Sequence, residues 1–127
     1  MRALLTFLLL TGTAHAGCND TLLSFTDWSI KPLDAEAFQI TTTFKSNADK
    51  PIRMIEARAA YFDALGAMVG SFELNRDASI QPGGTYVETK TWGKYTFERL
   101  LVLKHDEVRP FVCVIAVLFD DGTKQAF

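Results

Sequence analysis

The chain has 127 residues and a nearly balanced charge, with 13 basic against 15 acidic side chains. It contains no basic stripe or tail, which argues against a nucleic-acid partner. After the first sixteen residues the longest apolar run, Phe111 to Phe119, is far shorter than the ~20 residues that a membrane-spanning helix needs.

The first sixteen residues have the three-part layout of a secretory signal peptide. Arg2 supplies a positive charge, residues 3–10 are almost entirely apolar, and Ala14-His15-Ala16 is a small-x-small cleavage site. We therefore expect residues 1–16 to be removed as a signal peptide. Residues 17–127 are then expected to form a single domain in the periplasm or outside the cell.

Cys18 and Cys113 are the two cysteines of the chain. In an exported protein an even pair predicts a disulfide, which would fasten the N-terminal segment to the domain. The alternative is a free thiol at Cys18 and a buried apolar side chain at Cys113. Lipid anchoring of Cys18 is a further, weaker alternative, because His15 stands where a lipobox has a large aliphatic residue.

The apolar residues of the remaining chain recur mostly with a period of two, and many are β-branched or aromatic, which is typical of strands. Glu88 and Lys90 indicate that their strand is half exposed. A helix over Arg53–Leu65 is an alternative for one segment, and Tyr95–Leu103 fits either a helical turn or a strand. In chain order, the expected strands are Phe25–Ile30, Phe38–Phe44, Ile52–Asp63, Ala67–Leu74, Thr85–Trp92, Phe111–Phe119 and Thr123–Phe127.

Turn residues separate these segments. Asp63-Ala64-Leu65-Gly66 and Gln81-Pro82-Gly83-Gly84 predict tight turns, because Pro presets φ and Gly permits a positive φ. Asp121-Gly122 predicts a type I′ hairpin turn. The whole pattern predicts an all-β, antiparallel β-sandwich of about seven short strands.

The segment from Thr41 to Gly84 resembles the bacterial FxLYD-type immunoglobulin-like domains. The matching pieces are Asn47 in a turn, the strand Ile52–Phe62, the turn Asp63–Gly66, and Pro82-Gly83. The five-residue signature of the family corresponds to residues 59–63. Asp63 is identical to the family residue, whereas Ala59, Tyr61 and Phe62 stand where the family has Phe, Leu and Tyr. The resemblance implies an immunoglobulin-like fold and a non-catalytic surface module, in a family that has no shared active site.

No arrangement of side chains in the sequence indicates catalysis, a cofactor or a metal site. The one histidine after residue 16 is His105, in Lys104-His105-Asp106-Glu107, and consecutive residues on an extended chain point in alternating directions. This segment therefore predicts a solvated loop rather than a metal site. No nucleophile elbow or phosphate loop is present either, so we expect a protein that is not an enzyme.

The strand Phe111–Phe119 is a first candidate for recognition, because it is apolar on both faces. Strict alternation places Ile115 and Val117 on one face and Ala116 on the other. A sandwich strand normally has one solvated face. Either the segment that contains Cys18 covers the second face, or a partner does.

Trp92-Gly93-Lys94-Tyr95 is the second candidate, since two aromatic residues flank a flexible, basic tip. We take Trp92, Lys94 and Tyr95 as candidate partner contacts, and core aromatics at a strand end as the alternative.

The sequence thus predicts an exported, non-catalytic binding or assembly module of the cell envelope with a protein partner. The sequence also allows a homodimer that forms through the strand Phe111–Phe119. The alternative function is an accessory or inhibitor protein that blocks an enzyme through the aromatic loop.

Overall fold

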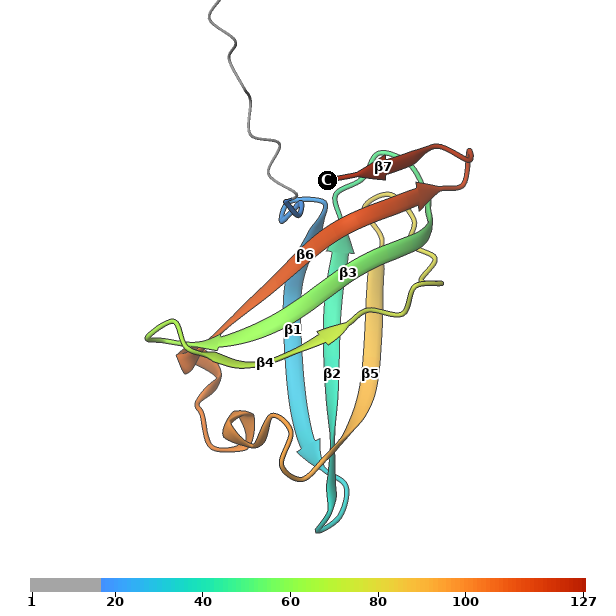
Figure 1. Ribbon diagram of the computed structural model, residues 1–127. Coiled ribbons are helices and arrows are strands. Elements are labelled where there is room, and N and C mark those ends of the chain that lie inside the picture. Colours follow the sequence, from blue (N-terminus) through green and yellow to red (C-terminus); the bar gives the residue numbers. More distant parts are fainter. Residues whose placement is uncertain (1–16) are drawn as a thin grey trace, which may run out of the picture.

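The computed structural model describes residues 17–127, which form two antiparallel sheets packed face to face (Figure 1). The predicted signal peptide, residues 1–16, lies outside the described residues. One sheet has the strand order β1-β2-β5 and the other the order β4-β3-β6-β7. The strands are β1 (Leu23–Pro32), β2 (Ala37–Ser46), β3 (Ile52–Asp63), β4 (Met68–Glu73), β5 (Thr85–Gly93), β6 (Val108–Phe119) and β7 (Lys124–Ala126), and two short 3₁₀ helices are η1 (Glu98–Leu101) and η2 (His105–Glu107).

The connections follow the Greek-key path of an immunoglobulin-like sandwich. All strand pairs are antiparallel, and the chain passes from one sheet to the other after β2, β4 and β5. In Figure 1 the strands of the four-stranded sheet cross obliquely over β1, β2 and β5. The predicted fold class is therefore confirmed. Within residues 17–127, no helix has both the length and the apolar character needed to cross a bilayer.

The core lies between the two sheets. On β2 every second residue from Phe38 to Ser46 is buried, as the period-two pattern predicts. The hydroxyl groups of Thr42 on β2 and Tyr61 on β3 lie 2.8 Å apart in the buried interior and join the two sheets. The helix considered for Arg53–Leu65 is wrong. This segment is β3, which pairs with β4 on one side and β6 on the other, and that pairing outweighs helix propensity.

The β3–β4 and β6–β7 connections are turns of the same kind. The N–H of Gly66 donates to the carbonyl of Asp63 at 2.9 Å, and that of Gly122 donates to the carbonyl of Phe119 at 3.0 Å. Both glycines have a positive φ, whereas Asp121 does not. A type I′ turn requires a positive φ at both central residues, so that prediction is wrong: the hairpin is a three-residue type I turn closed by a left-handed glycine.

The β4–β5 connection contains the Pro-Gly turn that the sequence predicts. The N–H of Gly84 donates to the carbonyl of Gln81 at 2.8 Å, and Gly83 has a φ of 68°. Proline followed by a glycine with positive φ is the arrangement of a type II turn.

A β-bulge on β6 changes the two faces that strict alternation predicts. Glu56 pairs with Ala116 but the next residue of β3, Ala57, pairs with Val114, so Ile115 is skipped. Ile115 and Ala116 are consequently both outside the core, and Val117 is buried. The predicted assignment of Ile115 and Val117 to one face is therefore wrong beyond Val114.

Candidate functional site

The residues predicted as partner contacts divide between the core and the surface. Trp92 is half-buried, and its ring centroid lies 4.9 Å from that of Phe97 and 6.3 Å from that of Phe72. Its indole nitrogen has no hydrogen-bond partner among the described residues. Lys94 and Tyr95 are exposed, with the Lys94 ammonium 5.4 Å from the centre of the Tyr95 ring. Lys94 and Tyr95 are thus free to contact a partner, whereas Trp92 packs against the core.

Two buried side chains anchor the segment that follows β5. Phe97 and Leu100 belong to the hydrophobic core, with exposed fractions of 5% and 1%. Phe97 has a φ of 57°, which makes it the one non-glycine residue with a positive φ in the described part of the chain. An aromatic residue in this region is strained, and the surrounding packing must hold it there. Tyr95–Leu103, which the sequence leaves open, therefore contains a fixed helical turn, η1.

Four exposed apolar side chains belong to this connection and to the β1–β2 turn that it contacts. The N–H of Lys94 donates to the carbonyl of Glu36 in the β1–β2 turn at 2.9 Å. Lys94 and Leu101 also line a small hollow of about 60 Å³ together with residues of that turn. We call the four side chains the loop-end patch; they are Leu33 (48% exposed), Tyr95 (79%), Leu101 (43%) and Val102 (81%).

An ion pair ties η1, the short helix that ends at Leu101, to the β3–β4 turn. The Arg99 guanidinium on η1 lies 2.9 Å from the Asp63 carboxylate. The other oxygen of Asp63 accepts the N–H groups of Leu65 and Ala67. The hydrogen bond from Ala67, together with Arg99, holds the pKa of the Asp63 carboxyl below its usual value. Asp63 therefore shapes its own turn and fixes η1 beside it.

The segment Lys104–Asp106 is exposed to solvent, as predicted, and the ring of His105 also packs against an edge strand. Its ring stacks on that of Trp28 of β1, with centroids 4.8 Å apart, and its Nε2 lies 3.3 Å from the Trp28 carbonyl. Asp27 lies 3.8 Å from the same nitrogen. This contact covers part of the open edge of β1. Among residues 17–127, no three His, Cys, Asp or Glu side chains gather as metal ligands.

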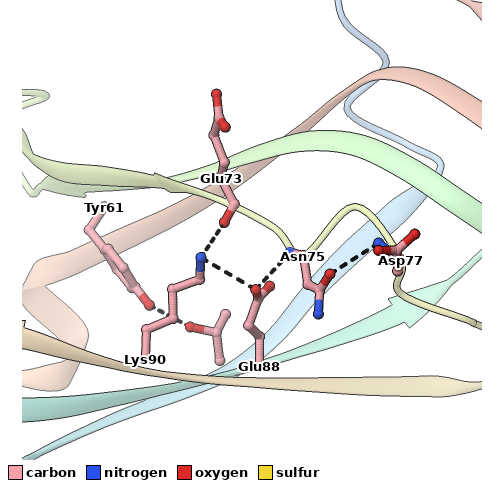
Figure 2. Close-up of polar contacts among 7 residues, drawn as sticks. Tyr61, Glu73, Asn75, Asp77, Glu88 and Lys90 are labelled. Atoms are coloured by element: carbon pink, nitrogen blue, oxygen red, sulfur yellow. Dashed lines mark hydrogen bonds and ion pairs between the residues drawn. The ribbon is translucent and has the colours of Figure 1, made fainter.

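Glu88 and Lys90 close the opposite flank of the sandwich (Figure 2). The Glu88 carboxylate is only 6% exposed and accepts the N–H of Asn75 at 2.7 Å. The Lys90 ammonium donates to the carbonyl of Glu73 at 2.7 Å and lies 3.6 Å from Glu88. Lys90 thus binds a backbone carbonyl at the end of β4, and Glu88 binds a backbone N–H just after it. The predicted half exposure of this strand is confirmed, because exposed residues alternate along β5 with buried or half-buried ones. Glu88 and Lys90, from which it was inferred, lie on the less exposed side.

Burial raises the pKa of the Glu88 carboxyl, and the hydrogen bond from Asn75 and the charge of Lys90 only partly oppose this shift. A raised carboxyl pKa can serve acid–base chemistry. Here one oxygen of Glu88 is used by Asn75 and the other has no partner among the described residues. The interaction that Glu88 makes is therefore structural, because its carboxylate accepts a hydrogen bond from the backbone N–H of Asn75 in its own domain.

Cys18 and Cys113 form the predicted disulfide, which spans 95 residues of sequence. The backbone of the next residue, Asn19, exchanges two 2.8 Å hydrogen bonds with Val114 of β6. The N-terminal segment is thereby fastened along one edge of β6. It covers the outward face of β6 only in part, since Phe111 and Ile115 each remain 40% exposed.

Beside the disulfide, the outward face of the four-stranded sheet contains an open hollow of about 700 Å³. Cross-strand pairing brings its wall residues together, because Phe62 pairs with Met68 and Ala60 with Phe111. Arg58 is the one lining residue with a charged side chain. We call this site the outer hollow; its apolar wall consists of Ala60, Phe62, Met68, Phe111, Ile115 and Phe127. The apolar residues on both faces of Phe111–Phe119 indicated an apolar surface on β6. The other lining residues of the outer hollow could not be predicted, because β3 and β4 bring them there by strand pairing.

Comparison with known proteins assigns the chain to no family. No family model matches the chain, and no curated protein matches it. One solved structure, described as "X-ray structure of Northeast Structural Genomics Consortium target SoR45", is 12% identical, with a TM-score of 0.42. The match covers 84% of this chain and 80% of that chain. The strand topology and the disulfide define the class of the protein as an immunoglobulin-like β-sandwich with one disulfide.

Proposed function

We propose that this protein is an exported, non-catalytic binding or assembly module of the cell envelope, with the loop-end patch as its contact surface for a protein partner. The proposal is supported chiefly by the connection after β5, which has both exposed and buried apolar side chains. Tyr95, Leu101 and Val102 face solvent, while Phe97 and Leu100 are buried and hold the backbone between them. A rigid, amphipathic tip presents contact area at low entropic cost, as hot-spot residues at interfaces do.

Export is supported by the signal-like first sixteen residues and by the disulfide. The disulfide uses the sulfur of Cys18, and a lipid anchor would need that same sulfur. Lipid anchoring at Cys18 and this disulfide therefore exclude each other. We expect the exported form to begin at Gly17, and its intact mass decides this; a protein that retains residues 1–16 or carries a lipid on Cys18 would contradict export by this route.

We propose that the protein is not an enzyme, because each carboxylate with a shifted pKa already accepts a hydrogen bond within the fold. Asp63 and Asp121 each accept hydrogen bonds within their own turns, and Glu88 accepts one from Asn75. Each of these groups thus has a structural task within the described residues. The same tip would also serve the second candidate function, an accessory or inhibitor protein, because Lys94 and Tyr95 project from the end of the sandwich.

Membership of the FxLYD-type domains is likewise a proposal. It is supported by the turns that carry the resemblance, since Asp63–Gly66 and the Pro82-Gly83 pair both form turns between strands. The homodimer through Phe111–Phe119 stays a prediction, and sedimentation of the exported protein tests it.

A pull-down from envelope extracts tests the contact surface. The exported protein is compared with the double variant Tyr95→Ala/Val102→Ser, and Val87→Ser is the matched control because Val87 is a 53% exposed apolar residue on β5. We expect the double variant to lose the partner at an unchanged melting temperature, and Val87→Ser to keep it. Equal capture by all three forms would refute the loop-end patch as the contact surface. Specific release of an enzyme's activity by the double variant would favour the inhibitor function.

A further inference from the structure

The outer hollow is a second surface that protein contact at the loop-end patch does not use. Its volume of about 700 Å³ lies within the range of roughly 300–1,000 Å³ that is usual for small-molecule sites. Met68 is 58% exposed, and Phe111 and Ile115 are each 40% exposed. Large apolar side chains around one concave site gain free energy when an apolar ligand removes them from water.

The charges around the outer hollow are predominantly positive. Arg58 lines it, and its ion pair with Glu73, 3.2 Å apart, is exposed and therefore weak. Arg109 is placed on the same face because it pairs across the strands with Phe62. Among residues 17–127 Arg109 forms no ion pair. The whole chain, in contrast, has a formal charge of −2.

A second hollow of about 370 Å³ continues along this face, and its charged lining residues are Arg76, Lys124 and Glu56. Glu56 lies 3.8 Å from Arg76. The face thus carries four cations and two carboxylates, and each carboxylate already has an arginine partner. Two copies stacked through this face would bring like charges together, which opposes a homodimer here.

We propose that the outer hollow binds a fatty acid, with the alkyl chain on the apolar wall and the carboxylate paired with Arg58. The apolar wall and the one charged side chain that lines the hollow match the two parts of such a ligand. The planar guanidinium can bind a carboxylate through two parallel hydrogen bonds, in place of its exposed contact with Glu73.

Calorimetric titration of the exported, disulfide-bonded protein with laurate tests the proposal. We expect saturable binding of one laurate per chain, which weakens by roughly fourfold for each methylene removed if every methylene is buried. Arg58→Gln should weaken binding about tenfold or more, whereas Lys45→Gln, an exposed cation on β2, should leave it unchanged. Dodecyl maltoside, with the same alkyl chain and no charge, should bind much more weakly than laurate.

Phe111→Ala changes the apolar wall and should also weaken laurate binding. Its melting temperature, and that of Arg58→Gln, are measured in parallel to confirm that each variant is folded. The proposal is overturned if laurate shows no saturable binding, if Arg58→Gln and Lys45→Gln behave alike, or if dodecyl maltoside binds as tightly as laurate. A homodimer that Phe111→Ala dissociates, without laurate binding, would assign this face to a second copy instead.

Discussion

The ring of Phe97 lies directly against the backbone of Gly70 on β4, so that a Cβ atom at position 70 would overlap the ring. Phe97 is buried and has a left-handed backbone, and its ring also contacts Trp92 and Tyr61. The missing side chain of Gly70 on the edge strand β4 thus leaves the space that the ring of Phe97 fills. The position of the loop-end patch depends on this contact.

Gly70→Ala should therefore destabilise the domain by about 1–3 kcal/mol, because the added methyl group forces Phe97 out of its place. Gly93→Ala is the matched control: a Cβ at Gly93 meets no atom within 4 Å, and its effect should stay within about 0.5 kcal/mol. Urea unfolding of the two variants measures the difference. Equal stability of both variants would show that Phe97 is not held by Gly70.

The two aromatic residues of the predicted tip should respond differently to truncation. Trp92→Ala removes a side chain packed on Phe97 and Phe72, and should cost about 3 kcal/mol of folding free energy. Tyr95→Ala removes a side chain that is 79% exposed, and should change the free energy of unfolding by less than about 0.5 kcal/mol. Thermal unfolding of the single variants separates them. A large loss for Tyr95→Ala would place that ring in the core.

The disulfide should contribute strongly to stability, because it closes a long loop. Cys113→Ser is expected to lower the free energy of unfolding by roughly 2–5 kcal/mol relative to the oxidised protein. Peptide mapping without reductant should recover the Cys18 and Cys113 peptides as one linked species. Two free thiols in the freshly exported protein would contradict this prediction.

Glu88 should make stability depend on pH in an unusual direction for a carboxylate. Burial raises its pKa in the folded state. Its contribution is therefore fully present below the unfolded-state pKa of about 4.3 and is lost as the pH rises through the higher folded-state pKa. Glu88→Gln, which keeps an oxygen for the Asn75 N–H, should be at least as stable as the natural protein at pH 7, and the difference should shrink towards pH 4.

Glu88→Ala is the contrasting variant, because it leaves the N–H of Asn75 without its acceptor and should cost about 1–3 kcal/mol. Melting temperatures from pH 4 to pH 7 check both variants. If Glu88→Gln lowers the melting temperature at pH 7 as much as Glu88→Ala does, the charge of Glu88 stabilises the folded protein, which is the opposite of the effect expected here.

The strands could be predicted because their signal is local. Ile52–Asp63 is the strand that the alternating residues predict, and the residues of β2 alternate as Phe38–Phe44 suggests. The turn type at Asp121-Gly122 was missed, because the same dipeptide suits a two-residue or a three-residue loop. The faces of β6 were misassigned because the bulge at Ile115 is set by pairing with β3.

The candidate sites were only partly predictable for a similar reason. The sequence predicts Trp92, Lys94 and Tyr95 as candidate contacts but cannot separate the two aromatic rings, because the role of Trp92 depends on where Phe97 and Phe72 lie. Arg58 lies beside Phe62 and Phe111 in the outer hollow only after β3 and β6 have paired. Such non-local contacts leave little trace in a single sequence.

Site-specific photo-crosslinking in living cells tests whether the loop-end patch contacts a partner. A photoreactive phenylalanine derivative is introduced at Tyr95, which is 79% exposed, and in a separate variant at Val87, which is 53% exposed. We expect a discrete protein adduct from position 95 in the envelope fraction and none from position 87. No adduct at position 95, or the same adducts from both positions, would contradict the account.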